Sequence, residues 1–140
     1  MKTFKEYISE KKVKVQSPDP AEAESLLKQA QARWADLRTL SINEKNASFR
    51  FESAYECLRE AIQSFMAREG YNPYSHEAVV VYAAEKGLLN EKETISFDRY
   101  REKRNDLNYR GQKITLEEAQ EIITFAKNML LKLRNIESFE

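Results

Sequence analysis

Residues that interrupt helices are scarce in this sequence. Its 140 residues include only 3 glycines and 3 prolines, and they contain no evenly spaced series of short strand-like segments. A shortage of both features is typical of helical proteins. Since 41% of the residues are hydrophobic, a chain of this length can bury one ordinary core. We therefore expect an all-α fold.

Residues that bind metals or cofactors are equally scarce. Cys57 is the only cysteine, which excludes an intramolecular disulfide and a cysteine-based zinc site. His76 is the only histidine, so carboxylates alone would have to hold a metal ion, and we expect no metal site. The sequence also has no glycine-rich phosphate loop and no nucleophile elbow, so we expect no cofactor.

Long apolar runs and an excess of one charge are also missing. Lys and Arg total 23, Asp and Glu total 23, and the formal net charge is +0, so only local charge can indicate an anionic partner. No segment reaches membrane-spanning length, and the N-terminus lacks the apolar stretch of a signal peptide. We expect a soluble, cytoplasmic protein with no membrane partner.

The sequence is rich in helix boundary signals. Asp19 followed by Pro20 predicts one helix start, and Asn90 with Glu93 predicts another through a capping box. A loop is expected at YNPY, because proline disfavours a helical residue before it. These signals, with helix-ending glycines, divide the chain into apolar-striped segments at about 20–42, 47–69, 75–86, 90–110 and from 115 onwards. This pattern predicts an up-and-down bundle of four to five helices with one short inserted helix.

Residues 1–16 differ in composition from the rest. They hold five lysines against two glutamates, and Phe4, Tyr7 and Ile8 could form one short apolar stripe. Two alternatives remain open for this segment, a charged, solvated tail or a short docking helix. The bundle domain would then occupy residues 17–140.

The segment FDRYREKRNDLNYRG, residues 97–111, has an unusual helical face. At about 100° per residue, Arg104 falls on the same arc as Phe97 and Leu107. A stripe with the i, i+3, i+4, i+7, i+8 spacing of a core-facing surface runs beside that arc. Every residue of the stripe is polar, charged or a phenol: Arg101, Arg104, Asn105, Asn108 and Tyr109.

A guanidinium that faces a core needs a partner, because burying it alone costs several kcal/mol. In one alternative, Arg104 pairs with a carboxylate of another helix, for which the candidates are Glu52, Glu56 and Glu60. In the other, the stripe faces a cleft in which Arg101 and Arg104 bind an anion, above all phosphate.

Local charge bears on the second alternative. Residues 98–113 carry six basic side chains against three acidic ones. Tyr100 and Tyr109 alternate with the arginines, and aromatic rings so placed can stack on nucleic-acid bases. The segment therefore indicates RNA or a nucleotide as a candidate ligand.

Three segments carry a resemblance to a known family. They are FRFESAYECLREAIQSFMAREGYNPYSHEAVVVYAAEKGLL, FDRYREKRNDLNYRG and ITLEEAQEIITFAKNMLLKL. Together, over about residues 20–137, they resemble the HEPN domain, the higher eukaryote and prokaryote nucleotide-binding helical bundle. The most specific part is the Arg104-Asn105 pair. The resemblance implies a small helical bundle that dimerises and brings two copies of the arginine motif into one cleft.

The resemblance also implies a range of activities. Many HEPN proteins are metal-independent endoribonucleases, often toxins of toxin–antitoxin pairs, and others accompany a small nucleotidyltransferase. Their ribonuclease motif is Arg, four to six residues, then His, with a polar residue usually after the Arg. Arg104 matches the arginine and Asn105 the polar position, but Tyr109 stands where the histidine is expected. A tyrosine, with a pKa of about 10, is a poor base at neutral pH.

The remaining single residues have simpler interpretations. We expect His76 to cap or pack the third helix, or alternatively to replace the missing motif histidine. Cys57 is expected to be a small core or boundary residue. We interpret Trp34 and the phenylalanines as core residues.

Three hypotheses follow. The first is a dimeric domain that binds a nucleotide or an RNA phosphate, with Arg104 as the anion ligand, Asn105 orienting it and Tyr109 hydrogen bonding or stacking. The second is a weak metal-independent endoribonuclease that uses Tyr109 or His76. The third is a purely structural interaction module whose stripe is buried in ion pairs, with a nucleotidyltransferase or an antitoxin as the candidate partner.

Overall fold

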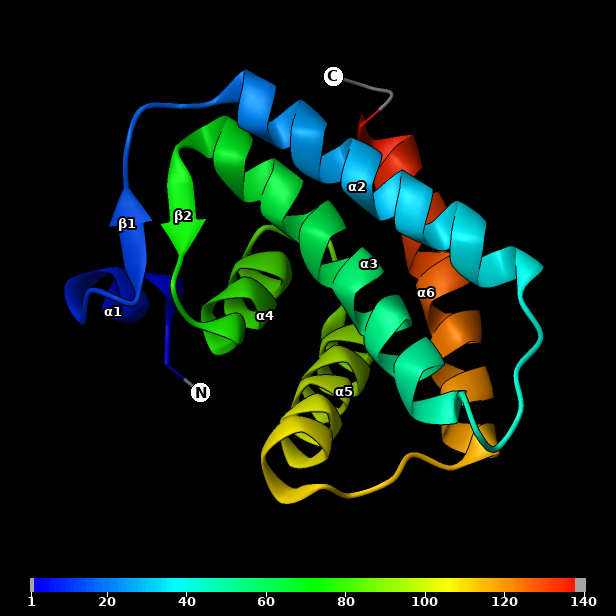
Figure 1. The fold of residues 1–140 in the computed structure, drawn as a ribbon. Helices are drawn as coiled ribbons and strands as arrows, with labels where there is room; N and C mark the ends of the chain where they lie inside the picture. The colour runs from blue at the N-terminus through cyan, green and yellow to red at the C-terminus, as the bar shows by residue number, and fades with distance from the viewer. Residues whose placement is uncertain (1, 138–140) are drawn as a thin grey trace.

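The computed structural model describes residues 2–137, which form six helices and one two-stranded sheet. The prediction of an all-α bundle is confirmed, although the number of helices exceeds the expected four or five because the N-terminal segment adds one. The elements in chain order are α1 (Phe4–Ser9), β1 (Val13–Val15), α2 (Pro20–Thr39), α3 (Ala47–Glu69), β2 (Tyr71–Pro73), α4 (His76–Glu85), α5 (Glu91–Arg110) and α6 (Leu116–Glu137) (Figure 1).

Side-chain caps fix the helix boundaries. The Asn90 side chain accepts a hydrogen bond from the Glu93 amide, and the Glu93 carboxylate accepts one from the Asn90 amide, both at 2.8 Å. Thr115 and Glu118 form the same reciprocal pair before α6. At the other end of α5, Gly111 takes a left-handed conformation with φ of 65°. These local contacts satisfy the backbone groups that a helix end leaves open.

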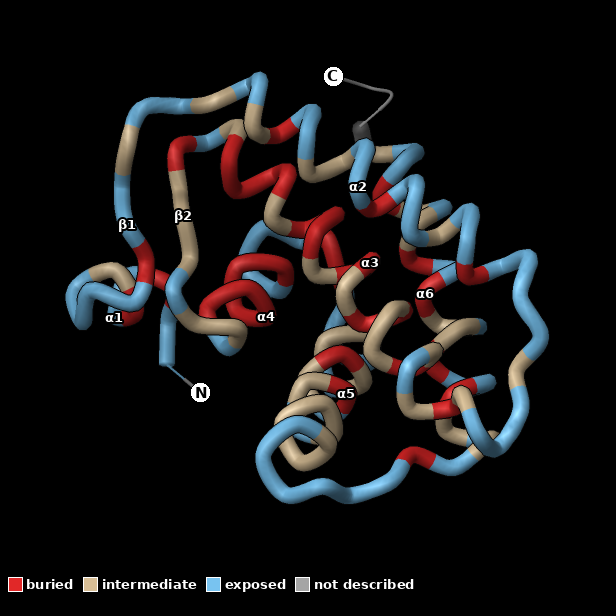
Figure 2. The backbone as a smooth tube through the Cα atoms, viewed as in Figure 1, coloured by how far each residue is buried: buried red, intermediate tan, exposed pale blue. Residues whose placement is uncertain are grey.

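Helix α3 is the centre of the bundle. Apolar side chains at helical spacing cover most of its circumference, so it is buried along nearly its whole length. It contacts α2 and α6 on one side and α4 and α5 on the other (Figure 1). Buried residues are accordingly concentrated on α3 and α4 (Figure 2). Two different surfaces can thus be built on the same helix.

Residues 2–16 are folded onto the bundle. Helix α1 buries Phe4 and Tyr7, and β1 buries Val13. The ring of Phe4 packs edge-on against Tyr71 at a centroid distance of 5.0 Å. Of the two alternatives for this segment, the short docking helix is therefore the one that the structure has, and the solvated tail is wrong.

Strands β1 and β2 pair antiparallel, with Val15 opposite Tyr71. The loop expected at YNPY is thus wrong for residues 71–73. The pairing continues beyond the strands, since the Gln16 amide donates to the Gly70 carbonyl at 2.8 Å. Gly70 has φ of 91°, and a Cβ at this position would collide with the Gln16 carbonyl oxygen. Both the backbone conformation and the close approach therefore require glycine.

Candidate functional site

Helix α5 carries the whole predicted stripe but turns its residues toward different surroundings. Arg101 and Arg104 are partly buried, with side chains that are 11% and 21% exposed. Asn108 is exposed, and Tyr109 is 82% exposed at the solvent side of the helix. The structure therefore does not gather the five stripe residues around one cleft within a single chain.

Arg104 lies against α3. Its guanidinium is 3.8 Å from Glu56 Oε1, and it sits over the ring of Tyr55 at 5.8 Å from the centroid. Glu56 is one of the three carboxylates that the sequence offered as partners. At 3.8 Å the pair is an ion pair but not a hydrogen bond. The Nε of Arg104 and the Oε1 of Glu56 are both buried and without a hydrogen-bond partner among the described residues.

Glu56 is held more firmly by a second arginine. Arg59 donates to Glu56 Oε2 through Nε at 3.1 Å and through a second guanidinium nitrogen at 2.5 Å. It also donates to Gln63. Burial of Glu56 favours its neutral form, but the Arg59 hydrogen bonds and the charges of Arg59 and Arg104 outweigh this and lower the pKa of the carboxyl group. Glu56 is therefore ionised at neutral pH.

Arg101 is tied to its own helix and to α4. Its Nε donates to Asp98 Oδ1 at 2.8 Å, and its guanidinium is 3.8 Å from Glu77. Glu77 in turn accepts a hydrogen bond of 2.8 Å from the Tyr7 hydroxyl. Burial and this hydrogen bond raise the pKa of Tyr7 to about 12. Arg101 thus connects α5 to α4 and, through Glu77, to α1.

His76, at the start of α4, joins the same group. Its ring stacks on Tyr55 with centroids 5.8 Å apart, and its Nδ1 is 3.1 Å from the Tyr55 hydroxyl. Burial lowers the pKa of His76, and the positive charges of Arg59 and Arg104 lower it further. The imidazole is therefore neutral at pH 7. His76 and Arg104 both contact the ring of Tyr55, although they come from different helices.

We call this group the arginine cluster. Its basic members come from α3 and α5, its imidazole from α4, and its acidic members from all three helices. It consists of Tyr55, Glu56, Arg59, His76, Glu77, Asp98, Arg101 and Arg104. Glu102 also lies 3.7 Å from Arg101, so three guanidinium groups face four carboxylates and the cluster carries no excess positive charge when His76 is neutral.

The remaining stripe residues lie on the outer face of α5. Asn105 and Tyr109 line a surface depression together with Glu102, Asp106 and Arg110. Arg110 is 3.7 Å from Asp106 and is therefore paired. Two carboxylates in this depression oppose a bound anion, and the one cation among its lining residues is already paired.

Sequence reasoning missed Arg59 and Tyr55 as members of the site. A signal for them exists, because Tyr55, Glu56 and Arg59 fall on one side of α3 at helical spacing. The broad apolar face of α3 dominates its pattern and masks this polar edge. The same angular arithmetic that singled out Arg104 on α5 places Arg59 next to Tyr55 on α3.

Comparison with family models, with curated proteins and with solved structures gave no match. Among residues 2–137, no helix is both long enough and apolar enough to cross a bilayer. No group of three or more His, Cys, Asp or Glu side chains in the same part of the chain could hold a metal ion.

Proposed function

We propose that this protein is an HEPN-type domain that binds a phosphate group of RNA or of a nucleotide through Arg104. One observation carries the proposal. Arg59 and Arg101 each donate hydrogen bonds to side chains of the cluster, whereas no hydrogen bond from Arg104 is found within residues 2–137. Arg104 is thus the one guanidinium of the cluster that donates no hydrogen bond within the described residues.

A phosphate oxygen is the partner that these donors suit best. Guanidinium and phosphate form short, charge-assisted hydrogen bonds, often two in parallel. The Arg104 side chain is 21% exposed, so its edge reaches solvent. Binding would replace the loose contact with Glu56 by a direct hydrogen bond, while Arg59 keeps Glu56 in place. No metal ion is needed for this recognition.

The oligomeric state and partners in this proposal rest on the HEPN resemblance alone. The resemblance implies a homodimer in which two copies of Arg104 face a common cleft. It also implies an antitoxin or a nucleotidyltransferase as the protein partner. In that arrangement Asn105, Asn108 and Tyr109 of the outer face of α5 would contact the ligand or the second subunit rather than the arginine cluster.

The test is a titration of labelled single-stranded RNA, followed by fluorescence anisotropy. Arg104→Ala should weaken binding roughly ten-fold, because one charge-assisted phosphate contact is lost. Arg99→Ala is the matched control, since it removes the same charge from the same helix at a side chain that is 52% exposed and pairs with Glu121 of α6. Equal losses in the two variants would rule out a specific role for Arg104.

One observation favours a second candidate, a metal-independent endoribonuclease. His76 is neutral and belongs to the same cluster as Arg104, whereas Tyr109 is exposed to solvent outside it. In the tautomer whose Nδ1–H donates to the Tyr55 hydroxyl oxygen, Nε2 is unprotonated and can accept a proton from a ribose 2′-OH. Arg104 would then stabilise the charge that develops on the phosphate. The geometry therefore favours His76 over Tyr109 as the base.

Incubating the protein with RNA in EDTA separates the two candidates. The endoribonuclease predicts cleavage that His76→Ala and Arg104→Ala abolish and that Tyr109→Phe preserves. RNA binding without cleavage supports the non-catalytic domain. Cleavage that survives Arg104→Ala would show a contaminating nuclease or a different site.

A further inference from the structure

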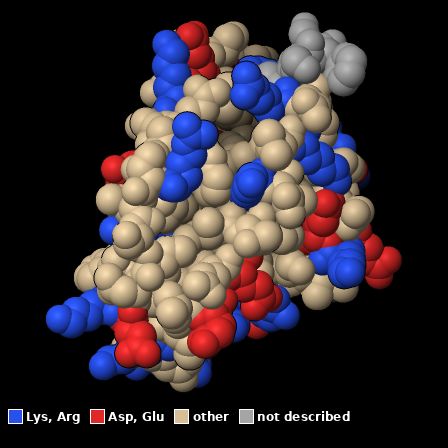
Figure 3. Space-filling view, turned by 90° about the vertical axis from the view of Figure 1, so that its right-hand side faces the viewer, with Lys and Arg blue, Asp and Glu red and all other residues tan. Residues whose placement is uncertain are grey.

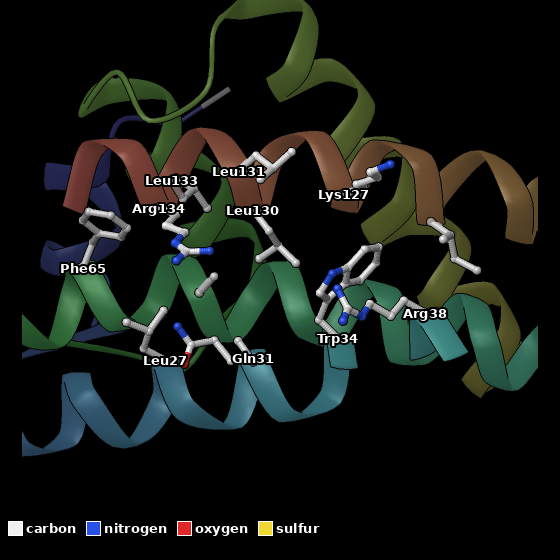
Figure 4. A pocket seen from close by; sticks show the side chains of 13 residues that line it. Leu27, Gln31, Trp34, Arg38, Phe65, Lys127, Leu130, Leu131, Leu133 and Arg134 are labelled. Atoms are coloured by element: carbon white, nitrogen blue, oxygen red, sulfur yellow. The ribbon is translucent and has the colours of Figure 1, made fainter. Parts of the chain in front are cut away.

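A second surface lies on the opposite side of α3. Helices α2 and α6 both pack on α3, and a groove of about 510 Å³ lies between them (Figure 4). Ala61 and Phe65 of α3 form its floor. Its walls are apolar and include Leu27, Trp34, Leu130 and Leu131. We call it the apolar groove. No residue of α4 or α5 lines it, so it is separate from the arginine cluster.

Three basic side chains border the apolar groove, namely Arg38 from α2 and Lys127 and Arg134 from α6. No acidic residue lines it. In the space-filling view, the uncharged hollow is bordered by Lys and Arg side chains (Figure 3). No ion pair of these three residues is found within residues 2–137.

Neighbouring basic residues on the same two helices behave differently. Lys28 of α2 pairs with Glu24 at 3.0 Å, and Lys132 of α6 pairs with Glu93 at 2.5 Å. Unpaired cations are therefore a property of the groove and not of α2 and α6 in general. An apolar trough bordered by cations complements a ligand with an apolar face and negative charges beside it.

The dimensions of the groove indicate the form of that ligand. Its lining extends from Leu27 to Arg38 on α2 and from Ile123 to Arg134 on α6. Eleven residue steps correspond to about 16 Å, or roughly three helical turns. Arg134 lies toward the Phe65 end and Arg38 toward the Trp34 end (Figure 4). Cations at both ends suit a ligand with negative charge along its length better than an amphiphile with one charged head.

We propose that the apolar groove binds an acidic amphipathic helix of a partner protein. Apolar side chains of such a helix at i, i+3, i+4 and i+7 would fill the groove between α2 and α6. Glutamate or aspartate on its flanks would pair with Arg38, Lys127 and Arg134. The site differs from the phosphate site in both position and ligand, so either can fail without the other.

Trp34 provides a direct test, because it is the only tryptophan of the chain and it lines the groove. The probe is a tryptophan-free synthetic peptide of about 14 residues, some four turns, with leucine at i, i+3, i+4 and i+7 and glutamate on both flanks. A control peptide carries lysine in place of each glutamate. The acidic peptide should shift Trp34 emission to shorter wavelength in a saturable titration, and the basic peptide should not.

Charge reversal locates the binding site. The combined substitution Arg38→Glu, Lys127→Glu and Arg134→Glu should weaken binding of the acidic peptide roughly ten-fold or more and should let the basic peptide bind. The combination Lys5→Glu, Lys14→Glu and Lys45→Glu changes the net charge equally at exposed residues outside the groove, and it should leave both titrations almost unchanged.

Three results of the peptide experiments would overturn the proposal. They are no saturable Trp34 shift with the acidic peptide, equal binding of the acidic and basic peptides, and equal weakening by the two sets of charge reversals.

Sedimentation tests a different occupant of the groove. A dimer that Leu131→Glu converts to a monomer would also overturn the proposal, since a second copy of the chain would then cover the groove. A dimer that survives Leu131→Glu would show that the second copy does not cover the groove, which the proposal requires.

Discussion

The two regions built on α3 use positive charge in opposite ways. In the arginine cluster, Arg59 and Arg101 are hydrogen bonded to carboxylates and are largely buried. At the apolar groove, Arg38 and Lys127 are exposed and face no acidic lining residue. The comparison shows that counting arginines does not identify a binding surface. What matters is whether the donors of each guanidinium or ammonium group are already used inside the fold.

Arg104 is intermediate between these two states. It is almost as buried as Arg59, with side-chain exposures of 21% and 20%, yet it makes only the loose contact with Glu56. A buried charge without hydrogen bonds is costly, and such residues are enriched at functional sites. This is why the phosphate proposal rests on Arg104 rather than on the total charge of the cluster.

The largest expected effect comes from truncating one aromatic side chain in each region. Tyr55→Ala should lower the free energy of unfolding by about 3–5 kcal/mol, because the ring is fully buried against Phe97 and His76. Trp34→Ala should cost less than half as much, since the Trp34 ring is only partly buried beside an open groove. Urea unfolding followed by circular dichroism measures both values. Equal losses of unfolding free energy would mean that the Trp34 ring is as fully buried as that of Tyr55 and that the groove is closed.

A smaller effect is expected from removing one cation in each region. Arg101→Ala should destabilise the fold by about 1–3 kcal/mol, because it leaves Asp98 partly buried without its partner. Lys127→Ala should change the free energy of unfolding by less than about 0.5 kcal/mol, since its charge has no partner to lose. The same unfolding experiment applies. A loss for Lys127→Ala that matched Arg101→Ala would contradict the contrast between paired and unpaired charges.

The smallest effect is a pH dependence confined to the arginine cluster. Burial and the charges of Arg59 and Arg104 lower the pKa of His76 from 6.5, and Glu56 only partly offsets them. The unfolded chain therefore binds a proton at a higher pH than the folded protein does. Stability should be unaffected above about pH 7 and should fall as the pH drops from about 6.5 toward the lower folded pKa.

Replacing the histidine isolates this contribution. The difference in unfolding free energy between wild type and His76→Asn should be constant above about pH 7 and should change between about pH 7 and 5, before the carboxylates titrate. Glu56 loses its own stabilising ionised state only at lower pH, because its pKa lies below 4.5. A difference that stayed flat over the whole range would show that His76 has the same pKa in both states.

The fold was predictable where the signal is local. Asn90 with Glu93 and Thr115 with Glu118 form the capping boxes that the sequence indicates, because each box needs only residues three positions apart. The strand pair was not predictable in the same way. Val15 pairs with Tyr71, far along the chain, and the short VKV segment follows two lysines in a lysine-rich stretch that is also typical of a solvated tail.

The site was predictable only in part, for a related reason. Helix arithmetic placed Arg104 on a buried arc and proposed Glu56 as one partner, and both features are present in the structure. Helical spacing alone does not indicate that Tyr109 faces solvent, because the exposure of residues 108–110 depends on where the other helices pack. Nor does helical spacing distinguish residues that line the groove from residues that are buried in the core. Trp34 follows the same apolar spacing as Leu37, yet only Leu37 is buried.

The phenylalanines illustrate the same limit of periodicity. Phe51 is fully buried, as expected for a core residue, whereas Phe49 is 71% exposed. The two lie two positions apart on α3 and therefore on nearly opposite sides of the helix. Which side of α3 is buried depends on where α2, α5 and α6 pack against it. The sequence of α3 alone does not determine that packing.

The most direct test of the phosphate site is a double-mutant cycle between Glu56 and Arg104, with RNA affinity measured by anisotropy. If Glu56 competes with phosphate for Arg104, Glu56→Gln should tighten binding by roughly three- to ten-fold. In the Arg104→Ala background the same substitution should have no effect. Tightening of the same size in both backgrounds would mean that Glu56 acts only through general charge, and it would contradict phosphate binding by Arg104.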